Sequence, residues 1–179
     1  MLIKKIKNFY MGDTQDLFDQ EAIEKIREIA KDANICHFVT NLSHQPLAAR
    51  PMATQQVDDS GNIWFFSGKK SDKNQDILKD NKVQLFYSAT NKYEYLSVYG
   101  SAEIVFDKEK IHELWTNFAK AWFPDGEDDP SLSLIKVTPS DGYYWDTKNN
   151  KFVSLLKIAK SIITGETDDD GGIEGRIEI

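Results

Sequence analysis

The chain of 179 residues contains a single cysteine, Cys36, so an intrachain disulfide is excluded. No apolar run approaches the roughly 20 residues that a membrane-spanning helix needs, and no signal-peptide pattern opens the sequence. An excess of positive charge is missing as well, because 22 lysines and arginines stand against 29 aspartates and glutamates. These absences predict a cytoplasmic protein that has neither a membrane nor a nucleic acid as its partner.

Motifs for common ligands are absent too. The sequence has neither the G-x-G-x-x-G fingerprint nor the G-x-x-x-x-G-K-[ST] phosphate loop. His37, His44 and His112 follow no metal-ligand spacing. Cys36 and His37 are neighbours on an expected strand, so their side chains point to opposite faces and are not expected to act as nucleophile and base. We therefore predict no metal site and assign no catalytic residue.

The composition is that of a globular protein, with 40% hydrophobic and 12% aromatic residues. The length suits one domain with a substantial core. We predict an N-terminal leader over residues 1–13, a folded domain over residues 14–164 and a flexible tail over residues 165–179. The tail is acidic and rich in glycine, which is typical of disordered segments.

Hydrophobic periodicity predicts a chain made mainly of strands. Helices are expected over residues 14–32, 72–81, 108–122 and 152–165. Strands are expected over residues 35–41, 47–57, 63–67, 82–89, 93–106, 132–139 and 141–147. Because these strands do not alternate with helices, a doubly wound parallel sheet is disfavoured. The pattern favours a mainly β fold, a small barrel of about six strands with peripheral helices.

Several residues carry sharper local expectations. Pro51 lacks a backbone N–H, so its strand should be an edge strand or contain a bulge. Gly100 lies in the middle of a strand, which indicates a bulge or a close approach of another backbone. Thr14 or Asp16 is expected to cap the first helix, and Leu78 is expected to point inward together with its neighbour Ile77.

The heptapeptide SGKKSDK, residues 67–73, gathers positive charge and hydroxyl groups in an acidic chain. Ser71 stands where the N-cap of the following helix is expected, and the first backbone N–H groups of a helix attract anions. Lysines 69, 70 and 73 would add charge, and Ser67 would add a hydroxyl donor. Two interpretations remain open at this point: a phosphate site, or a capped helix with lysines in solvent.

Arg50 is the one charged side chain on an otherwise small and apolar strand. Its planar guanidinium suits hydrogen bonding to an anion and stacking on an electron-rich ring. Pairing with a surface carboxylate is the alternative.

The order of these segments resembles a known family. "RPM" is followed by "IWFFSGKKSDK", then by "VQLFYSA", "YLSVYGSAEI" and "ELW", and finally by "AWFPDGEDDPSLSLIKVTPSDGYYWD". This order is similar to the FMN-binding split-barrel superfamily related to pyridoxamine 5′-phosphate oxidase, and within it to the general stress protein 26 group. The resemblance spans about residues 15–164. It implies a six-stranded split barrel that forms a homodimer and holds FMN in a groove between its two subunits.

The resemblance also implies roles for particular residues. Residues 50–52 would run along the flavin ring, Phe66 and Ser67 would lie beside the ribityl phosphate, and Ser71 and Lys73 would belong to the phosphate-binding turn. Lys69 and Lys70 would be helpers, and Trp145 would approach the ring from the partner subunit. The cofactor-binding residues expected in this way are Arg50, Pro51, Met52, Phe66, Ser67, Lys69, Ser71, Lys73 and Trp145.

The function implied is that of a flavin-dependent oxidoreductase that transfers a hydride or an electron through flavin N5 to a small substrate. A flavin-binding module or sensor without turnover is the main alternative. Oxidase activity on pyridoxamine 5′-phosphate is disfavoured, because the C-terminus has nothing that matches the arginine-containing segment of the oxidases. A haem-binding split barrel is a further alternative, and it would need a histidine ligand.

Overall fold

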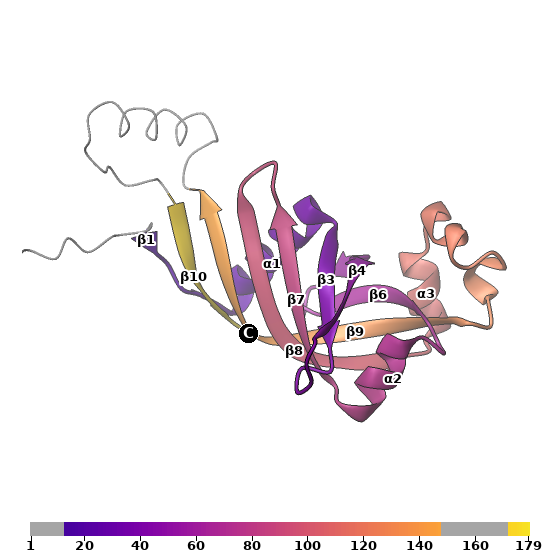
Figure 1. The fold of residues 1–179 in the computed structure, drawn as a ribbon. Coiled ribbons are helices and arrows are strands. Elements are labelled where there is room, and N and C mark those ends of the chain that lie inside the picture. Colours follow the sequence, from indigo (N-terminus) through magenta and orange to yellow (C-terminus); the bar gives the residue numbers. More distant parts are fainter. Residues whose placement is uncertain (1–12, 148–171) are drawn as a thin grey trace, which may run out of the picture.

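The computed structural model describes residues 13–147 and 172–179, and their strands form one sheet curved around a core (Figure 1). Two short strands pair in parallel with the C-terminal strand, and every other pairing is antiparallel. The strands of this described part are β1 (Asp13–Thr14), β2 (Leu17–Phe18), β3 (Ile35–Thr40), β4 (Ala48–Ala53), β5 (Gln56–Val57), β6 (Ile63–Gly68), β7 (Lys82–Ala89), β8 (Glu94–Val105), β9 (Leu132–Thr147) and β10 (Gly172–Glu178).

Helices cover the sides and one end of the sheet (Figure 1). They are α1 (Asp19–Ala33), α2 (Asp72–Lys79), α3 (Lys108–Leu114) and the 3₁₀ segments η1 (Asn117–Ala121) and η2 (Gly126–Asp128). Among the described residues, no helix is long and apolar enough to cross a membrane. The helix expected over residues 152–165 lies outside the described residues.

The sheet does not close into a complete barrel. The hydrogen-bonded order of its main path is β10-β9-β8-β7-β3-β4. Strand β6 pairs with the first half of β9, along the edge of β9 that faces away from β8. This arrangement brings β4 and β6 close together, but no hydrogen-bonded ladder joins them. β4 is therefore an edge strand, as Pro51 predicted. The gap between β4 and β6 is where the candidate site lies.

The inside of the curved sheet is filled by large apolar side chains. Phe38 of β3 and Phe65 of β6 are both fully buried, and their rings meet edge to face with centroids 5.3 Å apart. Helix α1 adds Ile26 and Ile29, which are also fully buried. A second apolar cluster lies beneath α3, where Leu114 packs near the end of β6.

The segments expected at residues 132–139 and 141–147 form one continuous strand, β9. It pairs with β8 along both halves, and the register shifts next to Gly100. A Cβ at Gly100 would stand 2.3 Å from the backbone oxygen of Thr138. The bulge and the close backbone approach expected at this glycine are both confirmed.

The C-terminal segment corrects one prediction. Residues 172–178, which we expected to belong to a flexible acidic tail, form β10 and pair with β9, β1 and β2. Ile177 is 1% exposed and packs in the main core, with Ile173 against its edge. The glycines and acids of the tail concealed these two inward isoleucines, which lie on one face of the strand.

Three expectations about helices are wrong in detail. Helix α1 begins at Asp19, because the residues before it pair with β10, so Thr14 and Asp16 do not cap it. The helix expected over residues 108–122 ends at Leu114, where the backbone becomes extended, and η1 follows. Leu78 of α2 is 70% exposed, whereas its neighbour Ile77 is buried as expected.

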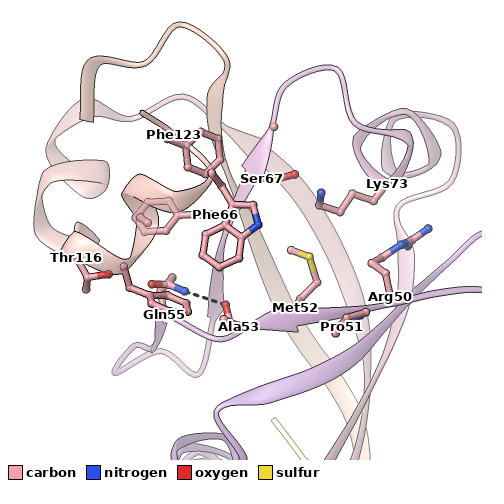
Figure 2. Close-up of a pocket in the computed structure, with 14 residues that line it drawn as sticks. Arg50, Pro51, Met52, Ala53, Gln55, Phe66, Ser67, Lys73, Thr116 and Phe123 are labelled. Atoms are coloured by element: carbon pink, nitrogen blue, oxygen red, sulfur yellow. Dashed lines mark hydrogen bonds between the residues drawn. The ribbon is translucent and has the colours of Figure 1, made fainter. Parts of the chain in front are cut away.

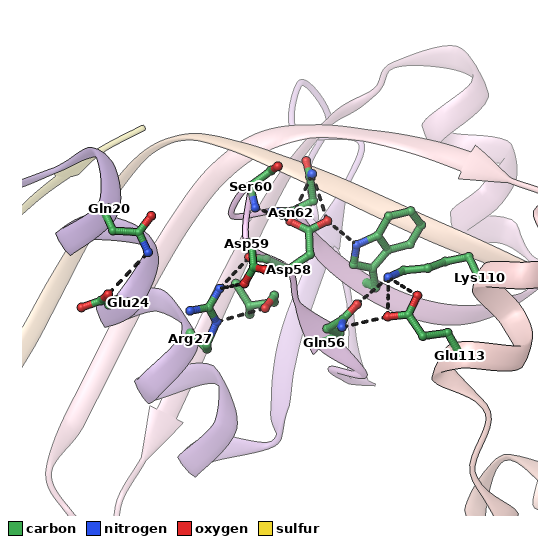
Figure 3. Close-up of polar contacts among 12 residues, drawn as sticks. Gln20, Glu24, Arg27, Gln56, Asp58, Asp59, Ser60, Asn62, Lys110 and Glu113 are labelled. Atoms are coloured by element: carbon green, nitrogen blue, oxygen red, sulfur yellow. Dashed lines mark hydrogen bonds and ion pairs between the residues drawn. The ribbon is translucent and has the colours of Figure 1, made fainter.

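A polar turn between β5 and β6 ties helix α1 to the sheet (Figure 3). Asp58 accepts hydrogen bonds from the backbone of Asn62 and from the Trp64 indole, the latter at 2.8 Å. From α1, the Arg27 guanidinium donates to the carbonyl oxygens of Val57 and Asp58. These contacts fix the start of β6, and so they fix one wall of the site.

Candidate functional site

A pocket with a volume of about 280 Å³ lies between β4, β6, α2 and η1 (Figure 2). Figure 2 shows Arg50 and Lys73 on one side of it and Phe66, Phe123 and Thr116 on the other. The fourteen lining residues are Arg50, Pro51, Met52, Ala53, Gln55, Phe66, Ser67, Gly68, Lys73, Thr116, Phe118, Ala119, Trp122 and Phe123. The pocket thus has a cationic end and an aromatic end.

Two cations converge at the first end. Burial and the nearby guanidinium of Arg50 lower the pKa of Lys73, and Asp72 only partly opposes this. No hydrogen bond or ion pair joins the Lys73 ammonium to any other described residue. Packing two like charges together costs free energy, and a bound anion would offset that cost. This end of the pocket is therefore suited to an anion.

Arg50 has an internal counter-ion. Its Nη1 donates to the Thr40 hydroxyl at 2.7 Å, and that hydroxyl donates to Asp76 of α2 at 2.6 Å. Arg50 Nη2 lies 3.6 Å from the same Asp76 oxygen. The guanidinium is therefore held in place while its side chain stays 24% exposed. The carboxylate partner that we left open for Arg50 exists, and Arg50 faces the pocket as well.

A buried amide supports the turn that precedes α2. Ser133 donates to the Ser67 carbonyl at 2.9 Å, so its hydroxyl is left to accept the bond from Asn74 Nδ2 at 3.1 Å. The Asn74 oxygen therefore faces the other way, where the hydroxyls of Ser67 and Ser71 lie at 2.7 and 3.2 Å. Asn74 is 1% exposed, and both sides of its amide are satisfied.

This network changes what the two serines can do. A hydroxyl has one proton, and those of Ser67 and Ser71 are directed at Asn74. Ser71 occupies the N-cap position, as predicted, but its side chain makes no cap hydrogen bond. The Ser71 side chain therefore accepts no hydrogen bond from the first backbone N–H groups of α2. The groups that remain for an anion are the two cations and these amides.

The other end of the pocket is aromatic. Phe66 packs edge to face against Trp115 and Phe123, with ring centroids 5.8 and 6.3 Å away. Phe118 and Trp122 lie 5.1 Å apart and line the opening, where they are 70% and 63% exposed. Aromatic side chains that border a cavity and remain in contact with water can stack on a planar ligand.

Three predicted residues do not line this pocket. The Lys69 ammonium lies over the Phe106 ring, 5.2 Å from its centroid. The Ser71 hydroxyl stabilises the turn by its hydrogen bond to Asn74. Trp145 belongs to the second half of β9, is 40% exposed and contacts Tyr143 at 4.8 Å. The remaining predicted residues, Arg50, Pro51, Met52, Phe66, Ser67 and Lys73, lie together around the cavity.

Sequence reasoning missed part of the pocket. Gln55 and Thr116 line it, although neither stands in a recognisable motif. Phe118 and Trp122 fall within the helix expected over residues 108–122, and only the break after Leu114 turns them toward the opening. Asn74 gave no signal, because an asparagine in a short helix is ordinary.

A mostly antiparallel, incompletely closed barrel that opens between β4 and β6, with a ligand-sized pocket in the opening, has the fold of a split barrel. The chain belongs to the family described as "Pyridoxamine 5′-phosphate oxidase like", whose sequence model matches residues 21–169. The expected fold class and the resemblance to the general stress protein 26 group are both confirmed. The six strands expected correspond to β3, β4, β6, β7, β8 and β9, and the described part of the chain adds β10 and the two-residue strands β1, β2 and β5.

Solved structures agree with this assignment. A general stress protein 26 from Jannaschia sp. CCS1 is 27% identical, has a TM-score of 0.72 and is matched over 87% of this chain and 97% of that one. A protein from Xanthomonas citri, described as a general stress FMN/FAD binding protein, is 25% identical with a TM-score of 0.63. That match covers 74% of this chain and 93% of the other.

The match to a further relative covers a smaller share of that protein's length. Protein bli-3 of Neurospora crassa is 26% identical over 129 residues, which is 67% of this chain. The match spans 62% of that relative, less than two thirds of its length.

Proposed function

We propose that the chain binds FMN in the pocket between β4 and β6, with the phosphate at the cationic end and the ring toward the aromatic end. The observation that carries this proposal is the pair Arg50 and Lys73, whose like charges converge while no described residue forms an ion pair or hydrogen bond with the Lys73 ammonium. A phosphate would offset their repulsion, and apolar walls suit a flat ring. The FMN/FAD binding description of the Xanthomonas citri structure supports a flavin as the ligand.

Within this proposal the residues around the phosphate have different roles. Arg50 and Lys73 hold the phosphate by charge, while the first amides of α2 donate to its oxygens. Ser67 and Ser71 act indirectly, because their protons keep Asn74 and the turn in place. Lys69 and Lys70 are exposed and contribute long-range charge alone. Met52 and Pro51 border the ring region.

The proposed working form is a homodimer. One chain supplies about 280 Å³, whereas sites that enclose a cofactor usually measure about 300–1,000 Å³. A row of cross-strand partners leads from Pro51 through His37 to Phe86 on the outer face of the sheet. Tyr95 and Trp145 pair on the same face and are 38% and 40% exposed. A second copy would cover this aromatic face and place its own Trp145 near the flavin.

We propose flavin-dependent oxidoreduction of a small molecule as the activity. FMN itself would supply hydride or electron transfer, and the protein would bind, orient and shield it. No carboxylate, histidine, cysteine or tyrosine is among the lining residues. Apart from Lys73, which is assigned to the phosphate, the described walls thus offer no side chain for general acid or base catalysis near neutral pH, which suits chemistry that is carried by the cofactor.

The lack of a carboxylate, histidine, cysteine or tyrosine among the described lining residues also favours a second candidate, a flavin-binding module or sensor without turnover. Reduced protein can be offered NAD(P)⁺-type and quinone-type acceptors, and the rate of flavin oxidation followed by absorbance. Oxidation faster than for free FMN supports the oxidoreductase. Rates that match those of free FMN with every acceptor support the module.

The phosphate anchor is tested by Lys73→Ala, with Lys79→Ala as the matched control. Both lysines belong to α2, but Lys79 is exposed and outside the pocket. Losing a charge-assisted contact of about 1.5–3 kcal/mol should weaken FMN binding about 10- to 100-fold in Lys73→Ala and leave Lys79→Ala unchanged. FMN titration followed by flavin fluorescence measures both. Equal affinity in the two variants, or no uptake of FMN by the unaltered protein, contradicts the proposal.

A further inference from the structure

A second cluster of like charge lies away from the pocket, where α1 meets the start of β8. Glu28 and Asp32 stand one turn apart on α1, so both carboxylates project from the same helix face. Glu94 is the first residue of β8. One oxygen from each of the three carboxylates lies within 4.8 Å of the other two.

The cluster contains a buried oxygen without a partner. Glu94 is 6% exposed, and its Oε2 has no hydrogen-bond partner in the described part of the chain. A buried carboxylate oxygen left in this way is costly, and it is uncommon in folded proteins unless a ligand or solvent satisfies it. Burial and the neighbouring carboxylate of Asp146 raise the pKa of Glu94, as expected where acids are crowded. The carboxylate that carries this oxygen lies beside the carboxylates of Glu28 and Asp32.

The charge in this region is not balanced by its own cations. Lys25 binds Glu28 at 2.9 Å and Asp146 at 2.8 Å, and Lys92 pairs with Asp32. When ionised, the four acids carry two more charges than these two ammonium groups. The acids are Glu28, Asp32, Glu94 and Asp146. One divalent cation would complete the balance.

The geometry indicates which cation fits. All three donors are carboxylate oxygens, the ligands of hard cations. Calcium accepts oxygen ligands at about 2.3–2.6 Å in flexible geometry, whereas magnesium demands a near-ideal octahedron at about 2.0–2.1 Å and gives up its water reluctantly, so three carboxylates from separate elements suit calcium better. Glu28 and Asp32 also line an open depression of about 340 Å³, which gives an ion access from solvent. Glu24 adds a third acid to this lining, and Arg27, Lys31 and Lys92 add three cations that an incoming ion would have to displace or pass.

We propose that Glu28, Asp32 and Glu94 form a binding site for a calcium-class divalent cation, with water completing the coordination. Lys92 occupies part of this site as an internal cation. Its side chain is 46% exposed on the hairpin between β7 and β8, so it can leave Asp32 when the ion binds. Three protein ligands and a competing lysine give a site of modest affinity, with a dissociation constant of about 0.1–1 mM.

The test uses the intact chain, stripped with a chelator and titrated calorimetrically with calcium chloride alone. Saturable binding of one calcium per chain is expected, and magnesium should bind more weakly. Glu94→Gln keeps the side chain's shape but removes the charge, and it should weaken calcium binding at least about tenfold. Glu109→Gln, an exposed change on α3, is the matched control and should bind as the unaltered chain does.

Lys92→Ala gives a second test that does not depend on the folding of the Glu94 variant. Removing the internal cation frees Asp32, so calcium should bind several-fold more tightly. Circular dichroism on each variant verifies the fold before titration. The proposal is overturned if the unaltered chain shows no saturable binding up to about 10 mM calcium. Equal affinity in Glu94→Gln and Glu109→Gln, or weaker binding in Lys92→Ala, would overturn it as well.

Discussion

The cationic end of the pocket and the acidic cluster of α1 and β8 follow the same electrostatic arrangement with opposite signs. Each packs like charges together, and each neutralises them only in part with an internal counter-ion, Asp76 in one and Lys92 in the other. They differ in their support. The cations stand beside the fully buried amide of Asn74, whereas the acids come from the surface of α1 and from the first residue of β8.

This difference indicates how firmly each site is preorganised. A site beside a satisfied buried network keeps its geometry without its ligand, and binding then costs little ordering. A site whose internal cation must leave binds more weakly and responds to ionic conditions. The cationic cluster is therefore the better candidate for a resident cofactor, and the acidic cluster for an exchangeable ion.

The largest expected effect comes from removing the support of the cationic site. Asn74→Ala deprives the buried hydroxyls of Ser67 and Ser133 of a partner and leaves a small cavity, so the free energy of unfolding should fall by about 2–4 kcal/mol. Gln75→Ala, the exposed neighbour in α2, should change it by less than about 0.5 kcal/mol. Urea unfolding measures both. Similar values for the two variants would show that the network is not the source of preorganisation.

An intermediate effect is expected from removing the internal anion of the cationic site. Asp76→Asn keeps the bond from Thr40 but frees Arg50 of its counter-charge, so FMN should bind about 3- to 10-fold more tightly if the proposed phosphate site is right. Asp59→Asn, on the exposed turn before β6, is the control. Flavin fluorescence titration gives the affinities. Weaker FMN binding in Asp76→Asn would contradict the inference that Asp76 competes with the phosphate for Arg50.

The smallest effect is the pH dependence of the repulsion between Lys73 and Arg50. The pKa of Lys73 in the folded chain lies below its ordinary value of 10.5. Burial of the Lys73 ammonium and its repulsion from Arg50 therefore cost stability while Lys73 is protonated, and that cost is relieved as the pH rises through the folded pKa toward 10.5. At neutral pH Lys73→Met should be more stable by less than about 1 kcal/mol, and its advantage should shrink with rising pH. Urea unfolding at several alkaline pH values tests this, and a constant advantage would argue against it.

Much of the fold could be predicted because its causes are local. Alternation of inward and outward residues identified the strands from β3 to β9, and Gly100 marked the bulge. Helix ends and β10 were predicted less well, since both depend on distant partners. Residues 13–18 have β10 to pair with, so α1 begins only at Asp19. Residues 172–178 are acidic and rich in glycine, and they form a strand because Ile177 packs into a core built by other segments.

The candidate site divides in the same way. By itself the sequence determined the family pattern, the positions of Arg50 and Lys73, and the β-rich architecture, because each rests on neighbouring residues or on the order of short segments. Tertiary structure alone brought Asp76 to Arg50, directed the protons of two serines to Asn74, and gathered four carboxylates from α1, β8 and β9. The physical reason is that charge and hydrogen bonding act over a few ångströms in space, whereas the sequence records only distance along the chain.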